Sequence, residues 1–251
     1  MLTNKQKKLI ASLGTTRGRK KSEFFLCEGK RSCLEAVKDC PNAIEFAVLA
    51  DSAKNMISPN QPFLVIEISD KEFNEITHTS TPQGILLVVK EPVLEAFDNR
   101  LKDDFVLVLD RVTDPGNIGT IIRAAWAAGL KEIWYTVGTT DPYGAKAVRS
   151  GMGAHFAMTF RRFQDLEEVE QIMTKLGGKL CLTKPLGTVS CFSDDFQFKG
   201  NAIVMGNEAN GIDYCSEQAQ EITIPMPGNA ESLNVAAAAT IVIFEYVRRI
   251  S

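Results

Sequence analysis

The second half of the chain alternates short apolar segments with segments of helical periodicity. "FVLVLD", "EIWYTV", "HFAMTF", "KLCLT", "AIVMG" and "EITIP" have the length and composition of strands, and "NIGTIIRAAWAAG" and "DLEEVEQIMTKLG" have those of helices. Continuous apolar strands that alternate with helices are typical of a parallel sheet covered on both faces. We therefore expect an α/β fold from residue 105 onward. Ligands in such folds bind beyond the carboxyl ends of the strands, so the loops there are the candidate site.

The first part of the chain has a different, mixed pattern. "AIEFAVLA", "FLVIEIS" and "GILLVVK" read as strands, and helical segments lie between them. The polar, proline-containing stretch "EPVLEAFDNRLKDD" follows and is the best candidate for a linker. We therefore predict a small α/β domain at residues 1–92, a linker at 93–104 and a larger domain at 105–251. Two domains suit a chain of 251 residues.

Charge is distributed unevenly along the chain. The net charge is −3, but residues 1–38 hold ten Lys/Arg against three Glu, which leaves +7 there and −10 in the remainder. The densest basic stretch is "GTTRGRKK" at residues 14–21. A basic arm on an acidic protein favours contact with phosphate groups, as in RNA. A solvated, partly disordered tail is the alternative.

The sequence lacks the residues that several kinds of site and segment require. The six cysteines form no C-x-x-C pair and only two histidines could supplement them, so we expect reduced, packed cysteines and no metal site. There is no P-loop, and "GMGAHF" lacks the third glycine of a dinucleotide fingerprint. No stretch is long and apolar enough for a membrane span, and the N-terminus does not resemble a signal peptide. We expect a cytoplasmic protein without a membrane contact.

The loop before the first helix of the larger domain carries candidate site residues. Asn117 stands where the helix "NIGTIIRAAWAAG" needs an N-cap. A helical wheel of this segment predicts that one face packs in the core, namely Ile118, Ile121, Ile122, Ala125 and Trp126. The opposite face carries Arg123 among small residues, namely Gly119, Thr120, Ala124 and Ala127. Such a face permits close approach of a ligand or a second chain. An ordinary exposed arginine is the alternative for Arg123.

Two further loops follow strands near the end of the chain. In "AIVMGNEANGI" the strand ends at Gly206 and Asn210-Gly211 favours a turn with positive φ. Glu208 either accepts hydrogen bonds from backbone N–H groups or acts in catalysis. In "PMPGNAESLNVAAAATIVIFEYVRR" we expect Ser232 to cap a helix that starts near Leu233. That helix is apolar on every face, which predicts burial on every face.

Three ordered motifs resemble one enzyme family. "DPGNIGTIIRAA", "IVMGNEANGI" and "IPMPGNAESLNVAAAA", with "YGAKAVRSGMGA" between the first two, resemble the SpoU/TrmH-type RNA ribose 2′-O-methyltransferases of the SPOUT superfamily. The resemblance covers residues 105–249. "FFLCEGKRSCLEAV" is similar to the start of that family's substrate-binding domain, which is ribosomal-protein-like.

The resemblance implies a fold, a cofactor and partners. The family's C-terminal domain contains a trefoil knot in which S-adenosyl-L-methionine binds. Its members are homodimers through this domain and act on RNA without a metal. Cofactor contacts carried over from the family fall on Thr183, Gly206, Ile224, Met226 and Leu233. The functional polar residues carried over are Asn117, Arg123, Glu208, Ser232 and Asn234.

The implied reaction is direct displacement of the sulfonium methyl group by a ribose 2′-hydroxyl. Arg123 is sometimes described as the base in this family, but a guanidinium with a pKa above ~12 is a poor proton acceptor. We therefore expect Arg123 to hold a phosphate and to stabilise the developing alkoxide. Ser232 and Asn234 would position the ribose or Arg123. Water or a phosphate oxygen would take the proton, and the sequence does not choose between them.

Three RNA-directed functions are consistent with these motifs. We expect methylation of ribosomal RNA, because family members with this kind of N-terminal domain often act there. Methylation of transfer RNA is one alternative. An RNA-binding protein that keeps the fold without catalysis is the other, although every polar residue of the motifs is present.

Overall fold

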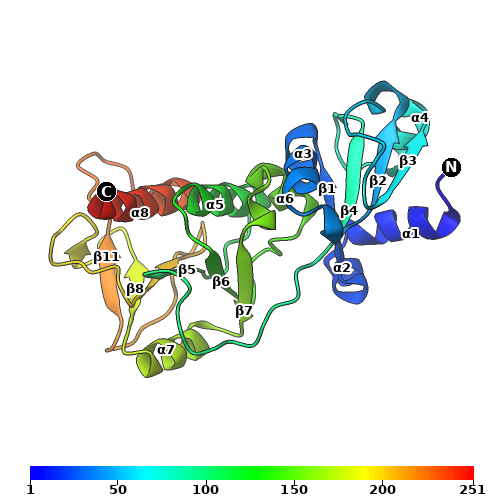
Figure 1. Cartoon of the computed structure of the whole chain (residues 1–251). Helices are drawn as coiled ribbons and strands as arrows, with labels where there is room; N and C mark the ends of the chain where they lie inside the picture. Colours follow the sequence, from blue (N-terminus) through cyan, green and yellow to red (C-terminus); the bar gives the residue numbers. More distant parts are fainter. The chain divides into compact units, whose positions relative to one another are not determined.

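The computed structural model describes residues 1–251 (Figure 1). Its internal contacts divide the chain into two compact units. The first unit comprises Met1–Val93 and Asp141–Ala157, and the second comprises Leu94–Thr140 and Met158–Ser251. The segment Asp141–Ala157 thus packs with the first unit although the sequence analysis assigns it to the C-terminal domain. The domain bounds at 1–92, 93–104 and 105–251 stay a prediction.

The first unit contains a mixed four-stranded sheet in the order β1-β4-β2-β3. Its strands are β1 (Phe24–Glu28), β2 (Ile44–Ala50), β3 (Leu64–Ile68) and β4 (Ile85–Lys90). β4 is antiparallel to β1 and β2, and β3 is parallel to β2. The sequence analysis predicts β2, β3 and β4 but misses β1. The apolar run of β1 is only four residues long before the buried Glu28, which makes it a weak signal.

The helices of the first unit include the basic arm. They are α1 (Asn4–Leu13), α2 (Thr16–Ser22), α3 (Lys30–Asp39), α4 (Asp70–Ile76) and α6 (Ala145–Gly151), with 3₁₀ turns at Pro41–Ala43, Asp51–Ala53 and Ala154–Phe156. The arm is therefore ordered as α1 and α2, and a disordered tail is excluded in this structure. Ile10 and Leu13 belong to the core of this unit, which explains why the arm folds onto it.

The basic arm, residues 1–21, holds seven cations, and two of them are used in internal contacts. Arg19 is buried, and its guanidinium donates from Nε to Asp141 Oδ2 at 2.8 Å and from Nη1 to the Leu13 carbonyl at 2.9 Å. Lys7 pairs with Glu72 at 2.6 Å. The other five cations are exposed and form no ion pair, namely Lys5, Lys8, Arg17, Lys20 and Lys21.

The second unit is built on a seven-stranded parallel sheet in the order β7-β6-β5-β10-β8-β11-β9. Its strands are β5 (Val106–Leu109), β6 (Glu132–Thr136), β7 (Thr159–Phe163), β8 (Leu180–Thr183), β9 (Val189–Ser190), β10 (Ala202–Met205) and β11 (Gln220–Thr223). Every neighbouring pair is parallel, which confirms the predicted α/β class. The prediction that "HFAMTF" forms a strand is wrong over its first part, because residues Ala154–Phe156 form a 3₁₀ turn after Gly153, at a φ of +101°.

Helices cover both faces of this sheet. α5 (Pro115–Ala127) and α8 (Val235–Ile250) pack against each other on one side, and α7 (Leu166–Lys175) lies on the other (Figure 1). None of the helices combines the length and the apolar composition that crossing a bilayer would require.

Both predicted N-caps next to the candidate site are wrong. The N-cap of α5 is Asp114, whose carboxylate accepts from the Asn117 backbone N–H at 2.9 Å. Pro115 follows it, and proline suits the first helical position because it has no N–H to satisfy. The N-cap of α8 is Asn234 rather than Ser232, because its side-chain oxygen accepts from two N–H groups of the first turn, at Ala236 and Ala237.

The helix faces also differ from the sequence analysis. In the single chain α8 is not buried on every face, since Ala237 is exposed and Phe244 is 43% exposed. On α5, Trp126 is 37% exposed although the wheel puts it in the core, and Gly119 is buried although the wheel puts it outside. The α5 and α8 helices pack against each other, and Gly119 but not Trp126 is among the buried residues of α5.

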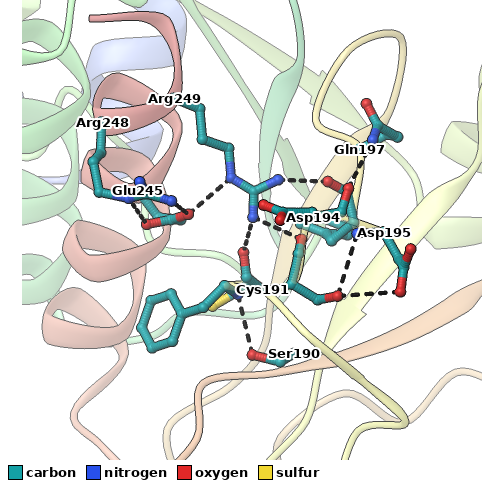
Figure 2. A network of polar contacts seen from close by, with 11 residues as sticks. Ser190, Cys191, Asp194, Asp195, Gln197, Glu245, Arg248 and Arg249 are labelled. Atoms are coloured by element: carbon teal, nitrogen blue, oxygen red, sulfur yellow. Dashed lines mark hydrogen bonds and ion pairs between the residues drawn. The ribbon is translucent and has the colours of Figure 1, made fainter.

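The C-terminal end of α8 is fastened to the loop after β9 by one arginine (Figure 2). Arg249 donates to the backbone carbonyls of Cys191 at 2.7 Å, Ser193 at 2.9 Å and Phe196 at 2.6 Å. It also donates to the buried Glu245 at 2.8 Å. Hydrogen bonds from Arg248 lower the pKa of Glu245, and burial raises it. The hydrogen bond from Arg249 lowers it again, and the pKa of Glu245 is about 2.

We predict that Arg249→Gln lowers the free energy of unfolding by about 3 kcal/mol, because it removes a partner of a buried carboxylate and the donor to three carbonyls. Arg248→Gln is the matched control, since Arg248 binds the same carboxylate but its side chain is 65% exposed. It should cost less than about 1 kcal/mol. Urea unfolding measures both variants, and equal losses would contradict the anchoring role of Arg249.

Candidate functional site

A pocket of about 590 Å³ lies at the carboxyl edge of the parallel sheet, where the sequence analysis expects the site. Thr183 ends β8, Gly206 follows β10 and Ile224 follows β11, and all three line it. The loop before α8 supplies another wall. All five residues predicted to contact a cofactor lie in the lining, namely Thr183, Gly206, Ile224, Met226 and Leu233.

Backbone geometry fixes the turn that forms one wall of this pocket. A Cβ on Gly206 would lie 2.5 Å from Ile212 Cγ1 and 2.7 Å from the Gly211 carbonyl carbon, so no side chain fits there. Asn207 shapes the turn that follows, because its side-chain oxygen accepts from the N–H groups of Ala209 and Asn210, each at 3.0 Å. The turn closes at Gly211 with a φ of +64°, which confirms the predicted positive φ.

Glu208 joins this turn to the start of α5. Its Oε2 accepts from the backbone N–H of Thr113 at 3.0 Å and from the hydroxyl of Thr113 at 3.1 Å. Its Oε1 accepts from the Asp114 N–H and from the Asn117 side-chain amide, each at 3.0 Å. Burial raises the pKa of Glu208, but the hydrogen bonds from Asn117, Thr113 and Asp114 have the larger combined effect and lower the pKa to about 2.

This geometry favours the anchoring role of Glu208 over proton transfer. A carboxyl group with so low a pKa is a weak base near neutral pH, and both oxygens already accept two hydrogen bonds. The N–H groups that it binds belong to the neighbouring loop at 113–114, so Glu208 ties two loops together.

Two asparagines extend the link to the last helix. The Asn234 side chain donates to Asn117 Oδ1 at 3.1 Å, while Asn117 donates to Glu208. Asn234 is also the N-cap of α8. The three motifs that carry the family resemblance therefore meet in one hydrogen-bonded chain of Glu208, Asn117 and Asn234. Thr113 and Asp114 donate to Glu208, and the Asn207 side-chain amide donates to the Arg111 carbonyl at 2.8 Å. These residues belong to the same scaffold but were not predicted, because these three contacts join segments that are far apart in the sequence.

The structure separates the remaining predicted residues. Ser232 lines the pocket and is exposed. Arg123 is exposed on α5, six residues beyond Asn117, and is not part of the pocket lining of the single chain. No group of three or more His, Cys, Asp or Glu side chains is placed to hold a metal ion.

We predict that Glu208→Gln destabilises the protein in a pH-dependent way. The folded pKa of about 2 lies below the ordinary value of 4.5, so the carboxylate contributes stability above pH 4.5 and loses this contribution as the pH falls toward 2. The variant should unfold at lower urea than the wild type at pH 7, and the gap should narrow below pH 4.5. Glu217→Gln, at an exposed position, is the control. A gap that stays constant from pH 7 to about 3 would contradict the assignment.

Comparison with known proteins identifies the family of this chain. A profile of the SpoU rRNA Methylase family matches residues 104–244, and one of the MRM3-like substrate binding domain matches residues 4–87. A similar curated protein is the 23S rRNA (guanosine(2553)-2′-O)-methyltransferase RlmP of Bacillus subtilis. It is 31% identical over 243 residues, which cover 96% of this chain and 95% of RlmP.

Solved structures show the same fold. The SpoU methyltransferase AviRb of Streptomyces viridochromogenes, in complex with the cofactor AdoMet, aligns with a TM-score of 0.83 at 28% identity over 100% of this chain and 99% of AviRb. An AdoMet-bound rRNA methyltransferase of Sinorhizobium meliloti aligns with a TM-score of 0.83 at 29% identity over 100% of this chain and 97% of the other. The family match covers more than half of the chain and both domains have counterparts. This chain belongs to the SpoU rRNA methylase family.

Proposed function

We propose that the chain transfers a methyl group from S-adenosyl-L-methionine to a ribose 2′-hydroxyl of ribosomal RNA. The observation that carries the proposal is the pocket at the sheet edge, which gathers residues of the second and third motifs and is tied to the first through Glu208 and Asn117. RlmP is named as a 23S rRNA methyltransferase, and AviRb is named as a SpoU methyltransferase. The name of RlmP favours ribosomal RNA over transfer RNA as the substrate.

The pocket suits such a cofactor. Its volume of about 590 Å³ is in the usual range for ligands of this size. Thr183, Gly206, Ile224, Met226 and Leu233 would hold the cofactor, largely through backbone groups. Gly206 lets the turn at Gly211 and Ile212 pack directly against the end of β10, which fixes this wall of the pocket.

When bound, S-adenosyl-L-methionine supplies an electrophilic methyl group on a sulfonium. The residues of this chain then have to bring the 2′-hydroxyl into line and stabilise its developing negative charge. Glu208, Asn117 and Asn234 would hold the three loops in place. Ser232, exposed at the pocket, would position the ribose. Arg123 would supply the positive charge, with water or a phosphate oxygen as proton acceptor.

A homodimer through the C-terminal domain fits the exposed surface of α5 and α8. Phe244, Trp126 and Ala237 are all exposed on these two packed helices, and a second copy of the chain would remove this apolar surface from water. Arg123 is also exposed on α5 and does not line the pocket of its own chain. In a dimer through this surface, Arg123 would lie near the second chain and would act at the pocket of that chain. The trefoil knot and the cytoplasmic location remain predictions.

The proposed reaction is tested with S-adenosyl-L-methionine that carries a labelled methyl group. The purified protein is incubated with deproteinised ribosomal RNA and, separately, with transfer RNA. We expect label in ribosomal RNA at one nucleotide, and resistance to alkaline cleavage after that nucleotide, because 2′-O-methylation removes the attacking hydroxyl. Label on a base, or in transfer RNA alone, would overturn the proposal.

We predict that Arg123→Ala lowers the rate of methyl transfer by about 10²–10³, because it removes a charge that would stabilise the transition state. The affinity for S-adenosyl-L-methionine, measured by calorimetry, should stay within a few-fold, since Arg123 does not line the pocket. Arg123→Lys keeps the charge and should be less impaired. Retention of a tenth of the rate by the alanine variant would argue against the role.

We predict that Phe244→Glu converts a dimer into monomers, because a charge would be buried in the interface. Leu64→Glu, at a 56% exposed leucine of β3 in the first unit, is the control and should leave the dimer intact. Sedimentation at micromolar concentration gives the mass, and a monomeric wild type would contradict the proposed interface.

A further inference from the structure

Arg111 has a backbone conformation that arginine seldom adopts. It lies just beyond the carboxyl end of β5 and has a φ of +54°, in the left-handed region. Glycine and asparagine tolerate this region better than arginine does. The backbone at this position therefore does not favour arginine, and such residues are candidates for a functional role of the side chain.

Neighbouring groups hold the guanidinium of Arg111 in one place. Its Nε donates to Asp110 Oδ2 at 3.1 Å, and its Nη2 lies 3.1 Å from the same oxygen. Asp110 is 3% exposed, and its other oxygen accepts from the Thr136 hydroxyl at 2.7 Å. Gly138 leaves room for the stem of Arg111, because a Cβ there would lie 3.0 Å from Arg111 Cγ. The guanidinium is thus fixed before any ligand arrives.

One side of this guanidinium remains available to a ligand. The Arg111 side chain is 42% exposed, and its Nη1 group forms no hydrogen bond within the protein. The planar guanidinium carries five N–H donors, and two of them fit the oxygens of one phosphate group. An arginine that a carboxylate holds on one side can therefore present its other side to a phosphate.

The backbone of Arg111 adjoins the candidate site. Its carbonyl accepts from the Asn207 side-chain amide at 2.8 Å, and Asn207 lines the pocket of that site. Two residues further along the chain, Thr113 donates to Glu208. Arg111 itself does not line the pocket. It lies beside the pocket, on the same carboxyl edge of the sheet.

Positive charge is scarce at this edge. Within the second unit, the loops that follow β5, β6, β8, β10 and β11 contain only two cations, Arg111 and Lys184. Lys184 is already paired with Glu221 at 2.5 Å. The same loops hold several acids, namely Asp110, Asp114, Glu208, Asp213, Glu217 and Glu231. A polyanion that approaches the pocket past these acids depends on the exposed guanidinium of Arg111 for attraction.

We propose that Arg111 binds the RNA phosphate next to the ribose that is methylated, through its Nη1 side, and so holds the strand at the pocket of its own chain. The inference rests on the proposed function and adds a substrate-binding residue to it. The role differs from that of Arg123, which would stabilise the charge of the transition state. A contact that is equally strong before and during the reaction lowers KM and leaves kcat unchanged.

The test removes the arginine without leaving Asp110 as a buried, unpaired charge. Asp110→Asn is compared with Asp110→Asn/Arg111→Gly, because glycine accepts the positive φ and the asparagine oxygen can still accept from Thr136. Binding of deproteinised ribosomal RNA is measured over a series of salt concentrations. The double variant should bind about fivefold more weakly, and its slope of log K against log salt should be flatter by ~0.7–0.9, the effect of one phosphate contact. Equal slopes would overturn the proposal, since Arg111 would then serve only to neutralise Asp110.

Arg100→Gln is the matched control. Arg100 is another exposed arginine of the second unit with an aspartate partner, Asp98, but it precedes β5 and so lies toward the amino end of that strand. This variant should keep the wild-type slope. A flattening equal to that caused by the loss of Arg111 would mean that any exposed arginine of this unit contributes, and would overturn a specific contact at the pocket.

Methyl transfer gives a second readout. Relative to Asp110→Asn, the double variant should raise KM for RNA about fivefold and keep kcat within about twofold. A lower kcat at unchanged KM, or a weakened affinity for S-adenosyl-L-methionine in calorimetry, would show that Arg111 acts through the loops of the pocket and would overturn the proposal. If the wild type does not methylate ribosomal RNA, the proposed function fails, and the salt series still decides whether Arg111 binds a phosphate.

Discussion

The carboxylate of Glu208 is the contact on which the geometry of the candidate site depends. It accepts three hydrogen bonds from the loop before α5 and a fourth from the Asn117 side chain in the first turn of that helix. Asn117 in turn accepts from Asn234, the N-cap of α8. Loops that follow different strands are thereby held as one rigid edge. Such an arrangement preorganises a pocket, because the loops need not be ordered when a ligand arrives.

The scaffold beneath this edge is a parallel sheet of short, buried strands. β5 and β10 are four residues each, buried throughout and paired in register from Val106 and Ala202 onward. Because parallel strands end at a common edge, Gly206 and Ile224 come together although they are far apart in the chain. At the other end of α8, Arg249 fastens the helix to three carbonyls of the loop after β9. The helix that caps the pocket is thus fixed at both ends.

The basic residues of the first unit have two different uses. The buried Arg19 forms an ion pair with Asp141, and this contact holds the arm in place. Lys30, Arg31 and Arg149 surround a cavity without ion pairs. Charge density along the sequence does not separate these groups, since Arg19 sits in the most basic stretch of all. Only the tertiary structure shows which cations are buried and paired.

The sequence by itself determined the α/β class, most of the strands and the loops that form the site, because apolar periodicity and turn residues act within a few positions. The family resemblance then supplied five candidate cofactor contacts, and the fold places all five in the lining of one pocket. Tertiary structure decided what depends on distant partners: the caps at Asp114 and Asn234, the anchoring bonds of Glu208, and the exposure of Phe244 and Trp126. It also placed Arg149 beside α3, which no local pattern encodes. Side-chain contacts across a hundred residues follow from how the strands are ordered in the sheet, and local sequence signals carry no record of that order.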